Sequence, residues 1–164
     1  MIRKAKLTDI KPIYDLLSDF ADRGHLLARP LSLLYDDIRS FWVYADDVTD
    51  RLLGCCALQI CWEELAEIRS LAVVPDHQGN HIGQKLVETA LTDAVVFNVK
   101  KVFTLTYIPS YFERFGFFTI DKTELPLKIW SDCITCVKFP DCDETAMLRH
   151  IRAEDAPAPG PEKE

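Results

Sequence analysis

The sequence predicts a single mixed α/β domain whose N-terminal half is a largely antiparallel sheet. The chain has 164 residues, which is a usual length for one domain and short for two. Helix-like and strand-like hydrophobic patterns follow one another in the order α, α, β, β, β, α, β, α, β, β. Two neighbouring strand patterns flank a short polar turn, which indicates an antiparallel hairpin.

Two helices are expected before the first strand. Thr8 is the expected N-cap of the first helix, which carries apolar residues at helical spacing as far as Phe20 and ends near Gly24. Asp9 lies in its first turn, where a negative charge favours the helix dipole. Ser32 is the expected N-cap of the second helix.

Strands and helices alternate over the rest of the chain. Residues 41–45 and 52–61 have the composition of strands, and the polar turn joins them into the hairpin. The further expected elements are a strand over 67–74, a helix over 82–96, a strand over 101–106, a short helix over 110–115, and strands over 117–120 and 145–151. We therefore expect a domain over 1–151 and a disordered tail, rich in Pro and Glu, over 152–164.

The composition excludes several classes of protein. There are 19 basic and 26 acidic residues, a net charge of −7, so no basic surplus exists to bind nucleic acid. No apolar run approaches the roughly 18–20 residues that cross a bilayer, so no membrane association is expected. The charged N-terminus is not followed by an apolar segment, so we expect no secretory signal and a cytoplasmic protein.

The six cysteines are interpreted as reduced thiols and not as a disulfide framework. Three of them lie in the apolar stretch 53–61, which is typical of buried thiols. Cys133, Cys136 and Cys142 have part of the spacing of a zinc site, but the fourth ligand is not evident. We expect no metal, with a metal or redox role for these three as the alternative.

The segment from Leu71 to Gly83 has the pattern of a strand, a loop and the start of a helix. Backbone N–H groups at a helix start point the same way and, together with the helix dipole, attract an anion. Gly79 and Gly83 would allow a phosphate to approach the backbone closely. The alternative is a glycine-containing loop that only caps the helix.

The same segment resembles the cofactor-binding core of the GNAT superfamily of N-acetyltransferases. The family's loop is commonly Arg/Gln-x-x-Gly-x-Gly/Ala, which Gln78 and Gly83 match, with His81 at the position of the first glycine. The stretch 111–117, Tyr-Phe-Glu-Arg-Phe-Gly-Phe, is similar to the family's Tyr-x-x-x-Gly-Phe element. The resemblance covers residues 2–151 and implies the GNAT fold, a single mixed, mostly antiparallel sheet flanked by helices.

The resemblance also implies acetyl-CoA as co-substrate and an amine as acceptor. Six stretches, 29–35, 41–43, 54–58, 67–73, 105–109 and 125–130, are similar to single-domain bacterial N-acetylglutamate synthases. That similarity implies acetyl transfer to the α-amine of L-glutamate, the first step of arginine biosynthesis. The residues expected to hold acetyl-CoA are Leu71, Ala72, Val73, Gln78, Gly79, Asn80, His81, Ile82, Gly83 and Gln84.

An α-amine is mostly protonated at neutral pH, so acetyl transfer needs a proton acceptor. Glu67 is the first candidate, acting directly or through one water. The alternative is a carboxylate that only pairs with Arg69, two residues further along the same strand face. Backbone N–H groups near residues 71–73 are expected to stabilise the oxyanion.

The leaving thiolate also needs a proton. The usual tyrosine of the family element is replaced by Phe112, which cannot donate one, and in a helix Tyr111 should point elsewhere. We expect that no side-chain acid is needed, because a thiol with a pKa of about 8.5 is a tolerable leaving group, and Tyr107 is the weaker candidate for a catalytic acid.

A dicarboxylate acceptor needs cations, and Arg29 and Arg69 are the candidates. The alternative for each is a solvated surface arginine. Other acceptors stay open: another amino acid, a polyamine or a protein N-terminus. The alternative to an enzyme is a non-catalytic protein, namely a CoA-binding module or a thiol-based regulatory module. The sequence leaves a homodimer open.

Overall fold

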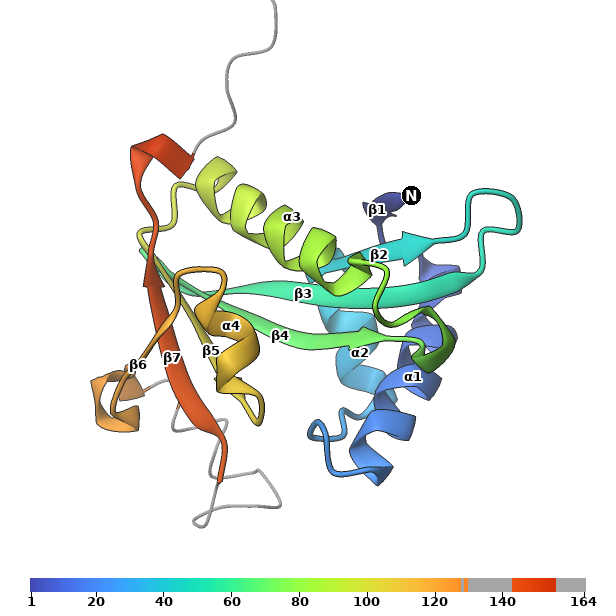
Figure 1. Ribbon diagram of the computed structural model, residues 1–164, viewed down its shortest axis with the longest axis horizontal. Helices are drawn as coiled ribbons and strands as arrows, with labels where there is room; N and C mark the ends of the chain where they lie inside the picture. Colours follow the sequence, from blue (N-terminus) through green and yellow to red (C-terminus); the bar gives the residue numbers. More distant parts are fainter. Residues whose placement is uncertain (128, 130–142, 156–164) are drawn as a thin grey trace, which may run out of the picture.

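The computed structural model describes residues 1–127, 129 and 143–155, which form a seven-stranded sheet flanked by helices (Figure 1). The strand order is β1-β2-β3-β4-β5-β7-β6, and only the β4–β5 pair is parallel. The mixed, mostly antiparallel sheet expected from the sequence is confirmed. The strands are β1 (Ile2–Lys4), β2 (Phe41–Ala45), β3 (Leu52–Trp62), β4 (Leu65–Val73), β5 (Lys101–Thr106), β6 (Phe118–Thr119) and β7 (Thr145–His150).

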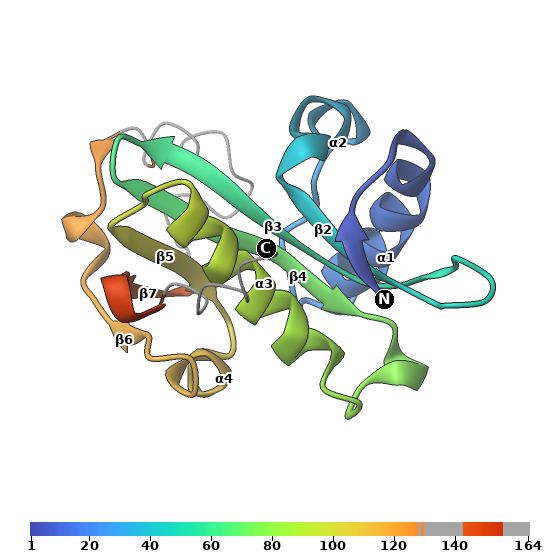
Figure 2. The same ribbon diagram turned by 90° about the horizontal axis from the view of Figure 1, so that it is seen from above.

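Helices cover both faces of the sheet (Figure 2). On one face, Leu86 of α3 and Phe112 of α4 share a core cluster with Ile68. On the other face, Ile13 of α1 shares a second cluster with Ala57. The central strand β3 therefore contributes alternate side chains to the two clusters, Cys56 and Leu58 to the first and Cys55 and Ala57 to the second. The helices are α1 (Ile10–Asp22), α2 (Leu31–Asp37), α3 (Ile82–Val96) and α4 (Pro109–Glu113).

Most element boundaries agree with the sequence prediction. The predicted ranges 41–45, 82–96 and 101–106 coincide with β2, α3 and β5. The other predicted elements are present with ends shifted by one or two residues, as is usual for helix and strand termini. β1 was not predicted, because three residues at the edge of a sheet are too few to show a periodicity.

Both predicted N-caps are wrong. Thr8 lies inside a 3₁₀ turn, Leu7–Asp9, and α1 begins only at Ile10. Ser32 lies inside α2, which begins at Leu31 after Pro30. Proline fixes its own φ and cannot donate a backbone hydrogen bond, so it suits the position before the helix without any side-chain cap.

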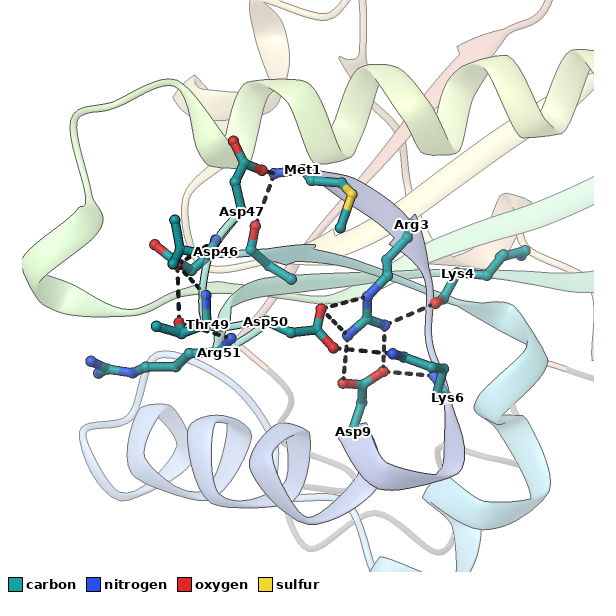
Figure 3. A network of polar contacts seen from close by, with 12 residues as sticks. Met1, Arg3, Lys4, Lys6, Asp9, Asp46, Asp47, Thr49, Asp50 and Arg51 are labelled. Carbon is teal, nitrogen blue, oxygen red and sulfur yellow. Dashed lines mark hydrogen bonds and ion pairs between the residues drawn. The ribbon is translucent and has the colours of Figure 1, made fainter.

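Asp9 belongs instead to a polar network that joins β1 to the start of α1 and to the β2–β3 turn (Figure 3). The guanidinium of Arg3 contacts both carboxylate oxygens of Asp9, at 2.7 and 3.1 Å. The backbone N–H of Lys6 donates to the same carboxylate at 2.6 Å, and Asp50 binds both Arg3 and Lys6. Burial acts to raise the pKa of Asp9, but these hydrogen bonds outweigh it and hold the pKa below its ordinary range.

The described chain extends a little further than the expected domain end at Ile151. Ala153–Asp155 form a 3₁₀ turn, and the Asp155 carboxylate binds the Arg149 guanidinium at 2.7 Å. Residues 156–164 of the expected tail lie outside the described residues. Over the described ranges, no helix is long and apolar enough to cross a membrane.

Candidate active site

A cleft of about 550 Å³ opens where β4 and β5 separate. The two strands pair only over Leu65–Glu67 and Lys101–Phe103, although β4 continues to Val73 and β5 to Thr106. Just past the last pair, the hydroxyl of Thr104 donates to the carbonyl oxygen of Ile68 at 2.9 Å and so replaces a lost ladder bond. The remaining facing edges are unpaired with each other, so their peptide groups are suited to bind an extended ligand that carries amides.

β4 carries a β-bulge in the wall of the cleft. Its pairing with β3 passes from Arg69 to Ala72, which leaves Ser70 and Leu71 opposite the single residue Cys56. Ser70 adopts φ +57°, in the left-handed region, which bends the strand at this point. Both bulged residues line the cleft. The backbone around Leu71, which we expected to stabilise an oxyanion, is therefore outside the regular ladder.

The start of α3 forms one end of the cleft. His81 precedes the helix with φ +60°, and no side chain of the described residues caps it. The first-turn N–H groups, residues 82–84, have no partners within the helix and suit an anion. Gly79 adopts φ +85°, and a Cβ there would meet nothing within 4 Å, so backbone conformation and not space explains the glycine. The amide of Gln78 donates to the Val73 carbonyl at 3.1 Å and ties the loop to β4.

Tyr111 of α4 reaches the start of α3 from across the cleft. A Cβ built on Gly83 would lie 2.7 Å from the Tyr111 hydroxyl oxygen. Phe112 is only 3 % exposed, and both aromatic residues line the cleft. Tyr111 therefore points into the cleft, with its hydroxyl at the start of α3. Neighbouring residues of a helix differ by about 100° in direction, so two of them can border one wide cleft.

Glu67 and Arg69 lie on the same face of β4, with 3.5 Å between the Glu67 Oε1 and the Arg69 Nε. Arg69 also donates to the side-chain oxygen of Gln59 on β3 at 2.7 Å. The ion pair foreseen as the alternative role of Glu67 is thus present. Arg69 lines the cleft, whereas Glu67, 13 % exposed, lies next to it without lining it.

Arg29 lies close to this pair, in the chain just before α2. Its Nη2 binds the Asp37 carboxylate at 2.6 Å, and its side chain is 10 % exposed. Its Nη1 is buried and has no hydrogen-bond partner among the described residues. Burial lowers the pKa of Arg29, and the charge of Arg69 lowers it further against the opposing effect of Asp37. Arg29 is therefore not a solvated surface arginine, although it does not line the cleft itself.

The cleft includes most of the predicted site residues and some that the sequence did not suggest. Of the predicted residues, only Glu67, Arg29 and Asn80 do not line it. Tyr107 lines it, and so does Glu144, which is 9 % exposed and was not foreseen. Thr145 pairs with Thr106, so Glu144 comes next to Tyr107 only through the β5–β7 pairing, which no local pattern reveals. His77 also lines the cleft, and so does Arg114, which was not predicted as a binding residue.

None of the described cysteines lines the cleft. Cys55 and Cys56 are buried free thiols, and Cys61 is a partly buried one. Burial raises the pKa of Cys55 to about 12 and also raises that of Cys56, so neither is a ready thiolate. Cys133, Cys136 and Cys142 lie outside the described residues. Within the described part of the chain, no three metal-ligating side chains gather in one place.

Comparisons with known proteins agree with this geometry. The family model of the acetyltransferase (GNAT) domain matches residues 37–118. An uncharacterized N-acetyltransferase of Chlorobaculum tepidum is 38 % identical over 150 residues, which are 92 % of this chain and 96 % of that protein. An amino-acid acetyltransferase of Mycobacterium tuberculosis is 32 % identical over 133 residues, which are 80 % of this chain and 76 % of that one.

A solved structure is similar over almost the whole chain. The N-acetylglutamate synthase of Neisseria gonorrhoeae, complexed with coenzyme A and N-acetyl-glutamate, superposes with a TM-score of 0.81 at 26 % identity. The match covers 93 % of this chain and 35 % of that one. The chain is therefore similar to about a third of that synthase.

Proposed function

We propose that this chain, which belongs to the GNAT family of acetyltransferases, transfers the acetyl group of acetyl-CoA to the α-amine of L-glutamate. The protein is an acetyltransferase, and acetyl-CoA is its co-substrate. Relatives named amino-acid acetyltransferase and the synthase structure support an amino-acid acceptor. The observation that supports L-glutamate as the acceptor is the pair of arginines, Arg29 and Arg69, beside Glu67.

The cleft fits acetyl-CoA in two respects. Its open end has the uncapped first turn of α3, which suits the pyrophosphate. Its interior has the unpaired edges of β4 and β5, which suit the amides of the pantetheine arm. An arm that runs along these edges brings the thioester to the bulge at Leu71, where a backbone N–H outside the ladder is suited to stabilise the oxyanion.

The reaction is the attack of a neutral amine on the thioester carbonyl. The C–N bond forms, the C–S bond breaks, and the electron pair leaves with the sulfur of coenzyme A. Glu67 takes the proton that the amine must lose. Because Glu67 lies beside the cleft and not in its lining, we favour transfer through one water over direct contact.

The thiolate needs little help to leave. Phe112 offers no proton at the position where the family usually has a tyrosine. We propose that the thiolate leaves without a side-chain acid, because a thiol pKa of about 8.5 makes it a stable anion. Tyr107, which lines the cleft, is the weaker alternative.

Arg29 and Arg69 supply the cations for the two carboxylates of glutamate. The unpartnered Nη1 of Arg29 is a buried donor, and such a donor is costly unless a ligand satisfies it. Asp37 and Gln59 hold the other ends of the two guanidiniums, at 2.6 and 2.7 Å. A planar guanidinium fixed in this way binds a carboxylate with defined geometry.

The test is a thiol-release assay with acetyl-CoA and each of the twenty amino acids, spermidine and a peptide N-terminus. We expect L-glutamate to be the best acceptor and glutamine to be poorer, because glutamine lacks the second charge. Preference for lysine or spermidine would exclude the glutamate assignment and leave the acetyltransferase assignment standing. Binding of acetyl-CoA without turnover of any amine would favour a non-catalytic module.

As part of the same proposal, the reaction belongs to arginine biosynthesis and takes place in the cytoplasm.

A further inference from the structure

The Tyr111 hydroxyl oxygen lies where a side chain at residue 83 would begin. A Cβ at this position would lie 2.7 Å from the Tyr111 hydroxyl oxygen, closer than real Cβ contacts. The next nearest atoms, the Tyr111 Cζ and the Val73 Cγ2, lie at an ordinary 3.7 Å. Without the hydroxyl, the site would therefore accept a methyl group.

The aromatic ring of Tyr111 has little freedom to move away. It packs edge-to-face against Phe112 and Phe115, with ring centroids 5.6 and 5.4 Å apart. The guanidinium of Arg114 lies over the ring, 4.6 Å from its centroid. The hydroxyl is thus held at the first turn of α3 by its own helix and by the residues that follow it.

The Tyr111 hydroxyl donates no hydrogen bond to any of the described residues. No hydrogen bond to it is found among the described residues, although the side chain is half-buried and lines the cleft. Burial raises the pKa of Tyr111, so the group is protonated and is a donor at neutral pH. It lies beside the N–H groups of the first turn of α3, which have no partners within the helix.

We propose that the Tyr111 hydroxyl donates a hydrogen bond to the pyrophosphate of acetyl-CoA, and that residue 83 is a glycine to leave room for this hydroxyl. This inference rests on the proposed placement of acetyl-CoA in the cleft. Tyr111 provides a side-chain donor beside the backbone N–H groups, and Arg114 adds a positive charge next to it. The competing explanation is that Gly83 gives the phosphate direct access to the backbone.

The two explanations differ in a double-mutant cycle measured by calorimetry with coenzyme A and with dephospho-coenzyme A. Tyr111→Phe should weaken the binding of both by about 10-fold, the usual effect of losing one hydrogen bond to a charged group. Dephospho-coenzyme A keeps the pyrophosphate and lacks only the 3′-phosphate, so the two losses should be equal. Tyr14→Phe on α1, outside the cleft, is the matched control and should change neither affinity.

Gly83→Ala should weaken binding of coenzyme A in the wild type, because the methyl group displaces the hydroxyl. In the Tyr111→Phe background it should add no further loss. Alanine suits a helix better than glycine does, so melting curves should show that the variants fold.

Three results would overturn the inference. Unchanged affinity in Tyr111→Phe would remove the hydrogen bond, and a smaller loss for dephospho-coenzyme A would assign the hydroxyl to the 3′-phosphate. A full penalty of Gly83→Ala in the Phe background would show that the glycine serves the phosphate and not the tyrosine. Failure of the wild type to bind coenzyme A at all would instead overturn the cofactor site on which the inference rests.

Discussion

The proposed cofactor site and the proposed acceptor site are built in different ways. The cofactor site is mostly one continuous segment, 71–84, and it offers backbone N–H groups at the start of α3. The acceptor site, in and beside the cleft, combines side chains from separate elements: Arg29, Asp37, Gln59, Glu67 and Arg69. Recognition by backbone depends on local conformation, whereas recognition by side chains depends on how distant segments pack. Changes at the two sites should therefore affect different steps of the reaction.

The difference also explains how an acidic protein can bind an anionic cofactor. A net charge of −7 gives no overall attraction for phosphates. Oriented N–H groups at a helix start create a local positive potential that does not depend on the net charge. At the proposed acceptor site, the positive charge comes from individual arginines that carboxylates hold in place.

The largest effect is expected from the proposed base. Glu67→Gln should lower kcat by about 10²-fold or more, because proton transfer is lost, and leave the KM for acetyl-CoA nearly unchanged. The measurement is steady-state kinetics with L-glutamate. Glu64→Gln, at the exposed β3–β4 turn, is the matched control. A kcat within about threefold of wild type would show that Glu67 is only an ion-pair partner of Arg69. The next candidate for the base would then be Glu144, the buried carboxylate of the cleft.

The acceptor site is tested by Arg29→Ala. The KM for glutamate should rise by about 10- to 100-fold, as expected for a lost hydrogen bond to a charged group. The KM for acetyl-CoA should not change, because the cofactor binds at the other site. The preference for glutamate over glutamine should also narrow if Arg29 binds the γ-carboxylate. Arg39→Ala removes an exposed arginine nearby as a control, and unchanged glutamate kinetics in Arg29→Ala would exclude this role.

A region that contacts neither substrate gives the third prediction. Asp9→Asn should lower the free energy of unfolding at pH 7 by about 1–3 kcal/mol, because it weakens a buried, charged hydrogen-bond network. The folded pKa of Asp9 is depressed, so its stabilisation is complete above the unfolded pKa of about 3.9 and is lost as pH falls through the folded pKa. Urea titrations of both proteins from pH 7 to pH 2 should converge at the acidic end. A change in kcat with unchanged stability would contradict a purely structural role.

The smallest effect is expected at His81. Its left-handed φ of +60° is costly for a residue with a Cβ, so His81→Gly should keep or raise stability, by at most about 1 kcal/mol. Affinity for coenzyme A should be kept or improved, which calorimetry would measure. Asn98→Gly, at φ +59° after the far end of α3, is the control for the conformational effect alone. A large loss of affinity in His81→Gly only would show that the imidazole contacts the phosphate.

The sequence by itself determined the elements whose signals are local. The apolar periodicity of residues 82–96 and the strand composition of 41–45 and 101–106 predicted α3, β2 and β5 with their observed bounds. The start of α3, which we propose binds the pyrophosphate, was located for the same reason, since glycines and a helix start are adjacent in the chain. Thr8 and Ser32 failed as caps because Asp9 and Pro30, also nearby, satisfy the helix starts in other ways.

Only the tertiary structure decided which side chains meet. The separation of β4 from β5 depends on a parallel pairing that stops after three residue pairs, and the hydrophobic pattern of either strand carries no sign of it. The contact of Tyr111 with Gly83, the approach of Arg29 to Arg69, and the place of Glu144 in the cleft join residues at least 28 positions apart. Such contacts form because two core clusters fix the helices and strands against each other, and a local sequence pattern contains no information about that packing.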